Sequence, residues 1–163
     1  MMLIINGTYQ SFNKMKFDVE LKINGILYKK NDLIRLCNSK INSPEFPEEK
    51  EIYEFILEWF NSENYITVNT SGTTNIPKTI QLLKENMINS AINTINFFKI
   101  KSYHNILLCL PVRFISGKMM IIRALVSKCN LLIVQPSKNP FQNLQNPKIY
   151  FTAITPYQLS YSI

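Results

Sequence analysis

The sequence predicts an α/β protein with a predominantly parallel sheet and flanking helices. From Tyr65 onward, strand-like apolar runs alternate with longer segments of helical periodicity, and a succession of strand, helix and strand produces parallel sheets with right-handed crossovers. The 163 residues are enough for one domain with a core, since chains of this size bury roughly two thirds of their unfolded surface. With 46% apolar and 18% charged residues, the composition is that of a folded protein rather than a disordered one.

Residues 1–60 are expected to form a lead-in to this sheet. Leu21 to Tyr28 reads as a hairpin around Asn24-Gly25, a strong turn dipeptide between apolar residues. A short helix is expected from Asp32, which could cap it, to Asn38. Glu48 to Phe60 predicts a longer helix, because large apolar residues recur at helical spacing and glutamates in the first turn suit the helix dipole.

Residues 61–163 are expected to carry the alternating elements as the first α/β part of a ligand-binding domain. The predicted strands are Tyr65 to Asn69, Thr79 to Leu83, Asn105 to Leu110, Leu131 to Val134 and Ile149 to Ala153. Between them, one helix carries an apolar stripe from Met87 to Phe98 and another spans Gly117 to Val126. Ligands of such folds bind at the carboxyl ends of the strands, so the segments that follow strands are the candidates for a site.

The net charge of +7 raises the possibility of nucleic-acid binding. Most of the basic residues are lysines, and they are spread along the chain instead of forming a block or alternating with aromatic residues. Such a distribution does not outline a nucleic-acid groove. We therefore interpret the charge as solvated surface charge and expect no nucleic-acid partner.

The cysteines, the histidine and the apolar runs argue against several other classes. Cys37, Cys109 and Cys129 lack the spacing of a metal or redox site, which favours free thiols in a reducing compartment. His104, the only histidine, has no neighbouring His or Cys, so no metal site is expected. No apolar run approaches the ~20 residues of a membrane span, and Met1 to Ile5 has no signal-peptide features. We expect a cytoplasmic protein without a membrane partner.

The strongest functional signal is a hydroxyl-rich loop between two predicted strands. Hydroxyl side chains crowd around one glycine, Gly72, whose missing Cβ lets a backbone turn approach a ligand closely. Exposed N–H groups in such a turn, with a lysine beside them, form an anion-binding concavity. The sequence of the loop is Thr70-Ser71-Gly72-Thr73-Thr74-Asn75-Ile76-Pro77-Lys78. It predicts a polyphosphate site, and a polar hairpin loop without a ligand is the alternative.

A Walker phosphate loop is excluded by the chemistry of this segment. Gly72, Lys78 and Thr79 fit the Walker frame, but Pro77 occupies the position of the second glycine. Proline has no N–H to donate and cannot adopt a positive φ. The run that follows, Thr79 to Leu83, is strand-like rather than the helix whose N-terminus would hold the phosphates. The loop therefore belongs to another class of phosphate-binding loops.

The loop resembles the signature of the acyl-adenylating superfamily, the AMP-forming acyl-CoA synthetases, which reads Thr-Ser-Gly-Ser/Thr-Thr-Gly-x-Pro-Lys. One position departs: Asn75 replaces a glycine, and asparagine is well tolerated at left-handed backbone angles. The resemblance implies ATP, Mg²⁺ and CoA as cofactors and co-substrates. It also implies that the ATP phosphates are bound by Thr70, Ser71, Gly72, Thr73, Thr74 and Lys78. No catalytic residue is assigned.

A second segment, Leu110 to Leu125, follows a predicted buried strand and opens a helix. Its Ser116-Gly117 start, followed by Arg123, resembles the o-succinylbenzoate-CoA ligases of menaquinone biosynthesis. The resemblance implies that Ser116, Gly117 and Arg123 contact the acyl substrate, with the Arg123 fork on a carboxylate. The spacing of seven places Ser116 and Arg123 on one helix face. As alternatives, Arg123 could pair with a local carboxylate, while Arg113 and Lys118 simply face water.

The resemblance extends from Trp59 to Tyr157. The family's Tyr-Gly-x-Thr-Glu segment, ribose-binding Asp and C-terminal domain with its catalytic Lys have no counterpart in the sequence. We therefore expect the N-terminal portion of an adenylating ligase, inactive on its own, with an unpaired apolar strand edge that favours self-association or a homodimer. The alternatives are another carboxylate-activating ligase and a non-catalytic basic module that binds nucleic acid or a protein.

Overall fold

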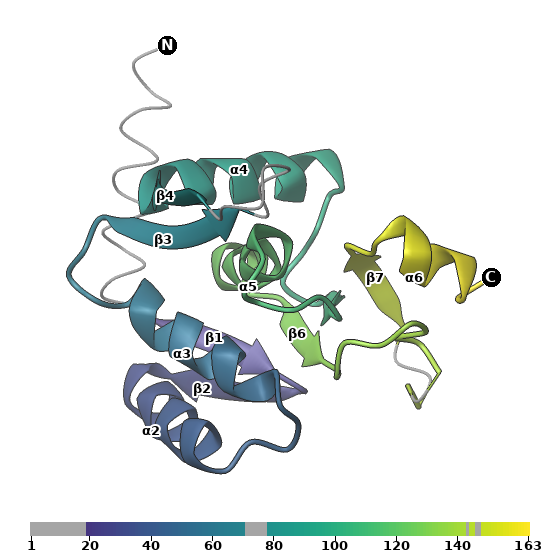
Figure 1. The fold of residues 1–163 in the computed structure, drawn as a ribbon, viewed down its shortest axis with the longest axis horizontal. Helices are drawn as coiled ribbons and strands as arrows, with labels where there is room; N and C mark the ends of the chain where they lie inside the picture. The colour runs from purple at the N-terminus through teal and green to yellow at the C-terminus, as the bar shows by residue number, and fades with distance from the viewer. Residues whose placement is uncertain (1–18, 71–77, 143, 146–147) are drawn as a thin grey trace.

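A computed structural model describes residues 19–70, 78–142, 144–145 and 148–163 (Figure 1). Its main sheet has five strands in the order β2-β1-β6-β5-β7. They are β1 (Glu20–Ile23), β2 (Ile26–Lys29), β5 (Asn105–Leu108), β6 (Asn130–Ile133) and β7 (Ile149–Thr152). Within this sheet, β1 and β2 pair antiparallel, whereas β1 with β6, β6 with β5, and β5 with β7 are parallel. The predicted α/β fold with a predominantly parallel sheet is confirmed.

The predicted N-terminal hairpin is confirmed. Ile23 pairs with Ile26, and the two residues between them, Asn24 and Gly25, have φ angles of 48° and 88°. Left-handed angles at both central residues are what a tight two-residue hairpin turn requires. Because β1 also pairs with β6, the hairpin forms one edge of the main sheet. The division of the chain at residue 60 stays a prediction.

Two helices follow the hairpin, α2 (Lys30–Asn42) and α3 (Glu49–Trp59). The predicted cap at Asp32 is wrong, because β2 passes into α2 without a connecting loop and Lys29 is the capping residue. Asp32 instead lies in the first turn of α2, where a carboxylate still favours the helix dipole. α3 matches its predicted span closely, and its apolar stripe is buried.

The strands that flank the hydroxyl-rich loop, β3 (Tyr65–Thr70) and β4 (Lys78–Leu83), form a separate two-stranded antiparallel sheet. The expectation that they alternate with helices as members of the main sheet is wrong. The seven residues between them are too few for a parallel crossover, which needs about a dozen or more. A hairpin is the pairing that so short a connection allows.

The core of the molecule is built around helix α5 (Ile115–Ser127). In Figure 1, α5 lies between the main sheet and α4 (Lys84–Phe97). Residues 117–122 are all buried, so every face of the helix is covered by other parts of the protein. The helix that carries the predicted substrate residues is therefore the central packing element of the fold.

The last element is the short helix α6 (Pro156–Ser160). Thr155 and Gln158 form a capping box at its start. The buried Gln158 amide also donates to the carbonyls of Cys109, 3.1 Å away, and Ser137, 3.0 Å away. Gln158 thereby fastens α6 to the segments that follow β5 and β6. Within the described ranges, no helix is both long and apolar enough to cross a bilayer.

Candidate functional site

The β3–β4 hairpin presents the hydroxyl-rich segment at its end. The two strands pair in register up to Thr70 and Lys78, which lie opposite each other. The predicted phosphate contacts Ser71, Gly72, Thr73 and Thr74 lie outside the described residues. The structure therefore brings the first and last residues of the motif together at the backbone level. The ATP contacts themselves remain a prediction.

Gly117 lies where the first turn of α5 passes very close to the segment after β5. A Cβ atom on Gly117 would lie 2.5 Å from the Pro111 carbonyl oxygen and 2.9 Å from that of Leu110. Backbone atoms cannot yield to such a contact as a flexible side chain could, so only glycine fits. Packing alone accounts for glycine at this position, and the predicted substrate contact of Gly117 remains a prediction.

Ser116 and Arg123 both lie on α5, about two helical turns apart. Ser116 is exposed in the first turn of α5, and seven residues of helix separate the two by about 10 Å along the axis. Helical side chains lean toward the N-terminus. Accordingly, Arg123 Nη1 reaches back to 3.6 Å from the Met120 sulfur. The two predicted residues share a face without touching each other.

The Arg123 guanidinium is half-buried and incompletely satisfied. Its Nε atom is buried and has no hydrogen-bond partner, and burial lowers the pKa of Arg123. In the described part of the chain, no Asp or Glu lies within ion-pair distance of this group, so the alternative of a local carboxylate partner is wrong there. Since buried donors are nearly always bonded, this unpaired Nε is a feature that the packing of the described residues does not explain.

Aromatic rings surround Arg123 on the side of β7. The guanidinium carbon lies 5.7 Å from the centre of the Phe151 ring. Phe151 contacts Phe98, which in turn contacts Phe97, each pair with ring centroids 4.9 Å apart. Phe97 and Phe98 are exposed. The aromatic series therefore runs from the Arg123 guanidinium to the molecular surface.

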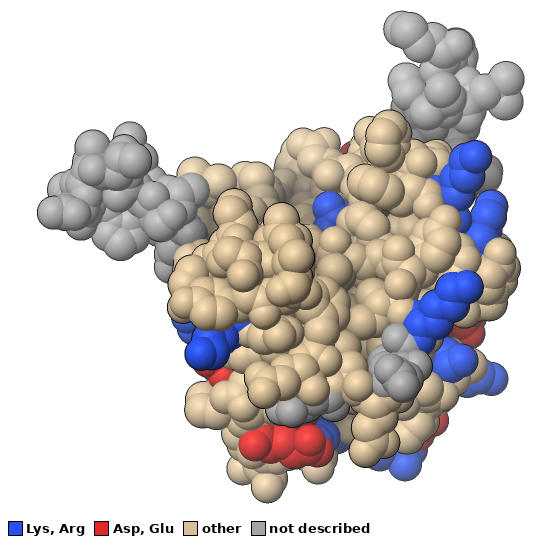
Figure 2. Space-filling model, turned by 90° about the vertical axis from the view of Figure 1, so that its right-hand side faces the viewer, with Lys and Arg blue, Asp and Glu red and all other residues tan. Residues whose placement is uncertain are grey.

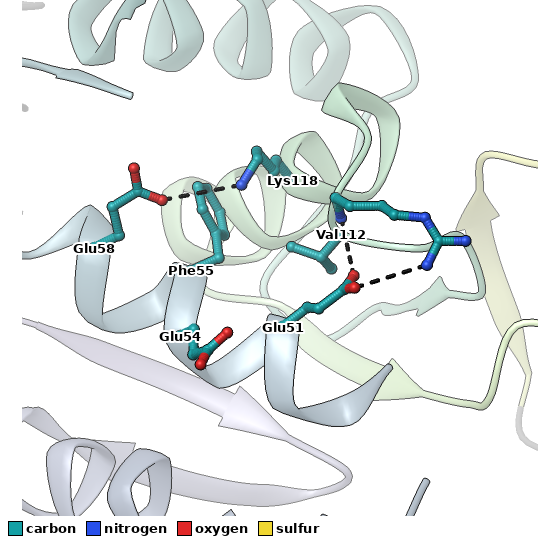
Figure 3. A pocket seen from close by; sticks show the side chains of 7 residues that line it. Glu51, Glu54, Phe55, Glu58, Val112 and Lys118 are labelled. Atoms are coloured by element: carbon teal, nitrogen blue, oxygen red, sulfur yellow. Dashed lines mark hydrogen bonds and ion pairs between the residues drawn. The ribbon is translucent and has the colours of Figure 1, made fainter. Parts of the chain in front are cut away.

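A second arrangement, which sequence reasoning missed, is a hollow of about 390 Å³ between α3 and the start of α5 (Figure 3). Its lining residues are Glu51, Glu54, Phe55 and Glu58 from α3 with Val112, Arg113 and Lys118. The three glutamates recur at helical spacing, which marks one face of α3. That spacing was the available signal, but nothing in the sequence indicates that basic residues some 60 positions later face it.

Each basic side chain of this hollow forms an ion pair with a glutamate of α3. Lys118 Nζ lies 4.0 Å from a Glu58 carboxylate oxygen and 4.3 Å from the centre of the Phe55 ring. Arg113 lies 3.7 Å from Glu51 and its backbone N–H donates to the same carboxylate. Lys118 is only 8% exposed, so the expectation that it faces water is wrong. Burial lowers the pKa of Lys118, and the charges of Glu58 and Glu51 oppose that shift.

On the face shown in Figure 2, most of the basic side chains lie along the right-hand side, and a broad area beside them carries few charged side chains. This face includes the β7 and α6 side of the molecule.

The three cysteines are buried, and the histidine ring packs against an aromatic ring. Cys37, Cys109 and Cys129 are buried free thiols, which confirms that they are unpaired. Burial raises the pKa of each thiol, to about 12 for Cys37. The His104 ring stacks on Tyr150 at 3.5 Å between centroids, and its Nδ1 accepts from the Lys101 N–H. Among the residues that the structure describes, no three His, Cys, Asp or Glu side chains gather as a possible metal site.

Comparison with known proteins gives a fold but little sequence similarity. No protein-family model matches the sequence, and no curated protein resembles it. The structure is similar to that of an AMP-forming acyl-CoA synthetase/AMP-acid ligase II-like protein from Dyadobacter fermentans, with a TM-score of 0.68 and 28% identity. The fold is that of part of an adenylating enzyme's N-terminal domain. The likeness covers 78% of this chain but 36% of the relative, so the chain spans about a third of that protein's length.

Two further solved structures show weaker and shorter likenesses. An o-succinylbenzoate CoA synthetase from Bacillus subtilis, bound to an acyl-adenylate intermediate, matches at a TM-score of 0.41 and 27% identity. That match covers 44% of this chain and 19% of the synthetase. The N-terminal subdomain of Klebsiella oxytoca NpsA matches at 0.38 and 21% identity, over 44% of this chain and 18% of the subdomain. Both likenesses are too slight to bear on function.

Proposed function

We propose that this chain is the N-terminal portion of an ATP-dependent, AMP-forming acid-CoA ligase, with o-succinylbenzoate of menaquinone biosynthesis as the acid. In the first step, a substrate carboxylate oxygen attacks the α-phosphorus of ATP and pyrophosphate leaves. The CoA thiol then attacks the acyl carbonyl and AMP leaves. The observation that carries the proposal is the adenylating-enzyme fold over most of the chain, with a phosphate-loop motif of that superfamily at the end of a hairpin.

The β3–β4 hairpin supplies the phosphate-binding part of the proposed site. Thr70, Ser71, Gly72, Thr73, Thr74 and Lys78 are the proposed contacts. Hydroxyl and backbone N–H donors together with the Lys78 ammonium stabilise charge on phosphoryl oxygens, which both steps require. Mg²⁺ would enter with ATP. The described residues provide no set of metal ligands, so we assign no residue to the ion.

Helix α5 supplies the proposed acid-binding part. Arg123 would bind the carboxylate of the acid that is not activated, assisted by Ser116, while Gly117 sets the approach of the helix to the preceding segment. The unpartnered Arg123 Nε and the lack of a carboxylate among its described neighbours support this role. The neighbouring aromatic rings of Phe151 and Phe98 suit an acid with an aryl ring.

The isolated chain is expected to catalyse nothing, because it spans about a third of its relative and catalysis needs all groups held in place. We place it in the cytoplasm on the basis of its three unpaired thiols. Among the described residues, β7 has one partner strand and lies at the end of the sheet. Its open edge is the proposed surface for self-association.

Binding of Mg²⁺–ATP to the chain tests the proposal, with line broadening in phosphorus NMR as the measurement. Lys78→Ala should weaken binding about 10- to 100-fold, because a hydrogen bond to a charged group contributes about 1.5 to 3 kcal/mol. Lys101→Ala removes an exposed lysine elsewhere and should leave binding unchanged. Equal losses of ATP affinity in both variants would mean that binding depends only on the net charge of the protein. Stronger, steeply salt-dependent binding to RNA or DNA would favour the basic-module alternative.

A further inference from the structure

The Asn24-Gly25 turn is held by three hydrogen bonds to the neighbouring strand. The Asn24 backbone N–H donates to the Leu131 carbonyl at 2.9 Å, and the Asn24 side-chain oxygen accepts from the Ile133 N–H at 2.9 Å. The Gly25 N–H donates to the Asn130 side-chain oxygen at 2.8 Å. The side chain of Asn24 thus continues the β1–β6 ladder beyond the last residue of β1.

The same two residues form a chemically reactive pair. In an Asn-Gly dipeptide, the glycine nitrogen can lose its proton and attack the Cγ carbon of the asparagine, since no glycine side chain hinders the approach. The new N–Cγ bond closes a succinimide ring while the Cγ–Nδ2 bond breaks and ammonia leaves. Water then opens the ring at either carbonyl and gives aspartate or isoaspartate. The reaction needs no oxidant, reductant or cofactor.

We propose that Asn24-Gly25 is a deamidation site that the native fold suppresses, and that Asn130 is the residue that suppresses it. Cyclisation requires the Gly25 nitrogen to leave the Asn130 oxygen and the Asn24 carboxamide to turn away from the Ile133 N–H. Each movement breaks a hydrogen bond. The attacking nitrogen and the carboxamide that it must attack are therefore each held by a separate partner on β6.

Asn130 is suited to this role because it is itself fixed. It is buried, and its side-chain nitrogen donates to the Asn105 side-chain oxygen at 2.8 Å. The Asn105 nitrogen in turn donates to the Lys148 carbonyl at 3.1 Å. This polar series joins β1, β6 and β5 to the residue before β7. The Asn130 oxygen cannot turn away from Gly25 without breaking the series.

The two products should differ in their effect on the fold. Aspartate at position 24 retains an oxygen that can accept from the Ile133 N–H, so the turn should still form. Isoaspartate inserts an extra methylene into the backbone at a turn with defined left-handed angles. The acceptor then no longer lies opposite Ile133. We expect the isoaspartate form to lose the clamp between β1 and β6.

The experiment incubates the chain at mildly alkaline pH and follows Asn24 by peptide mapping with mass spectrometry. Folded and denatured samples of the same chain are compared. Asn24 should react at least about tenfold more slowly in the folded chain, which corresponds to the loss of one hydrogen bond. Asn6-Gly7, the same dipeptide elsewhere in the chain, is followed in the same peptide maps for comparison. Equal rates for folded and denatured Asn24 would overturn the proposal.

Variants separate the role of Asn130 from that of the fold in general. Asn130→Ala should accelerate the reaction of Asn24 in the folded chain but not in denaturant. Asn105→Ala leaves the Gly25–Asn130 bond in place and should accelerate it less. Asn130→Asp keeps the acceptor oxygen but loses the donor to the Asn105 oxygen. It should therefore protect Asn24 about as well as Asn105→Ala does, and it provides a test if the alanine variant does not fold. A folded Asn130→Ala chain with the wild-type rate, or an Asn130→Asp chain that reacts as fast as the denatured one, would refute the role of Asn130.

Discussion

At the junction of α3 with α4, Lys84 is buried, with 1% of the residue exposed. It donates to the carbonyls of Glu58 and Asn61 and, at 2.8 Å, to the Asn61 side-chain oxygen. At the junction of α5 with β7, the Arg123 guanidinium has an aromatic ring and a sulfur atom as neighbours. Its buried Nε has no partner.

The difference separates a structural cation from a candidate binding cation. Removing a charged group from water is costly unless hydrogen bonds replace those to water. The contacts of Lys84 meet that condition with the Glu58 carbonyl in the last turn of α3 and with both oxygens of Asn61, just after the helix. Arg123 is partly removed from water, and no hydrogen bond at its Nε replaces the bond to water that is lost. An unsatisfied buried polar group of this kind needs an explanation, and a contact with a ligand is the one that we propose.

The largest expected effect is on the Lys84 junction. Lys84→Met keeps most of the side-chain volume but removes the charged donor to the Glu58 and Asn61 oxygens. The Glu58 carbonyl and the Asn61 side-chain oxygen then keep only neutral N–H donors, from Asn61 and Glu63. We expect a loss of about 3 kcal/mol in the free energy of unfolding, measured with urea. Lys50→Met is the matched control on α3, because its exposed pair with Glu54 contributes less than about 0.5 kcal/mol. Equal stabilities of the two variants would remove the structural role assigned to Lys84.

The sequence predicted the helices and strands well but not all of their partners. Hydrophobic periodicity sets where α3 and α5 lie, because the buried stripe is a local property of the chain. The Asn24-Gly25 turn was equally local. The pairing of β3 with β4 was missed because a strand pattern carries no information about its neighbour in the sheet. Loop length was the better guide, since so few residues exclude a parallel crossover.

The candidate site was predictable to a smaller extent. The loop motif and the Arg123 position come from resemblance, and the contacts of the loop lie outside the described residues. For Gly117, resemblance suggested a substrate contact, whereas its distance from the Pro111 carbonyl gives a packing reason. The Lys118 hollow escaped prediction because its two charged walls come from distant parts of the chain. Long-range juxtaposition of charges has no signature in a single sequence.

A smaller effect is expected at Lys118, whose charge is buried but matched by carboxylates. Its pKa is lowered in the folded protein, mainly by burial. Above that lowered pKa and below the ordinary lysine value of 10.5, the unfolded chain binds more protons than the folded one. Stability from this group therefore rises with pH in that window. Lys118→Met should abolish this rise while changing stability at neutral pH by about 1 kcal/mol or less.

Urea unfolding of wild-type and variant chains at several alkaline pH values measures this contribution as a difference. The subtraction is needed because the buried thiols act in the opposite direction: their raised pKa values make stability fall as pH rises above the ordinary cysteine pKa. Lys118→Arg keeps the charge throughout the range and should lack the rise as well. Parallel pH profiles for wild type and both variants would show that Lys118 does not titrate in the window.

The smallest effect on stability is expected at Arg123, together with a large effect on binding. Arg123→Met removes a cation–π contact with Phe151, which contributes roughly 0.5 to 1 kcal/mol, but also removes the cost of the unpartnered Nε. The free energy of unfolding should change by less than about 1 kcal/mol. Binding of o-succinylbenzoate should weaken far more than that of a monocarboxylate analogue, because only the dicarboxylate loses an ion pair. Arg113→Met, on the same segment but paired with Glu51, is the control and should affect neither acid. If Arg123→Met destabilises the chain as much as Lys84→Met does, and weakens both acids equally, Arg123 is a structural cation and the contrast between the two junctions fails.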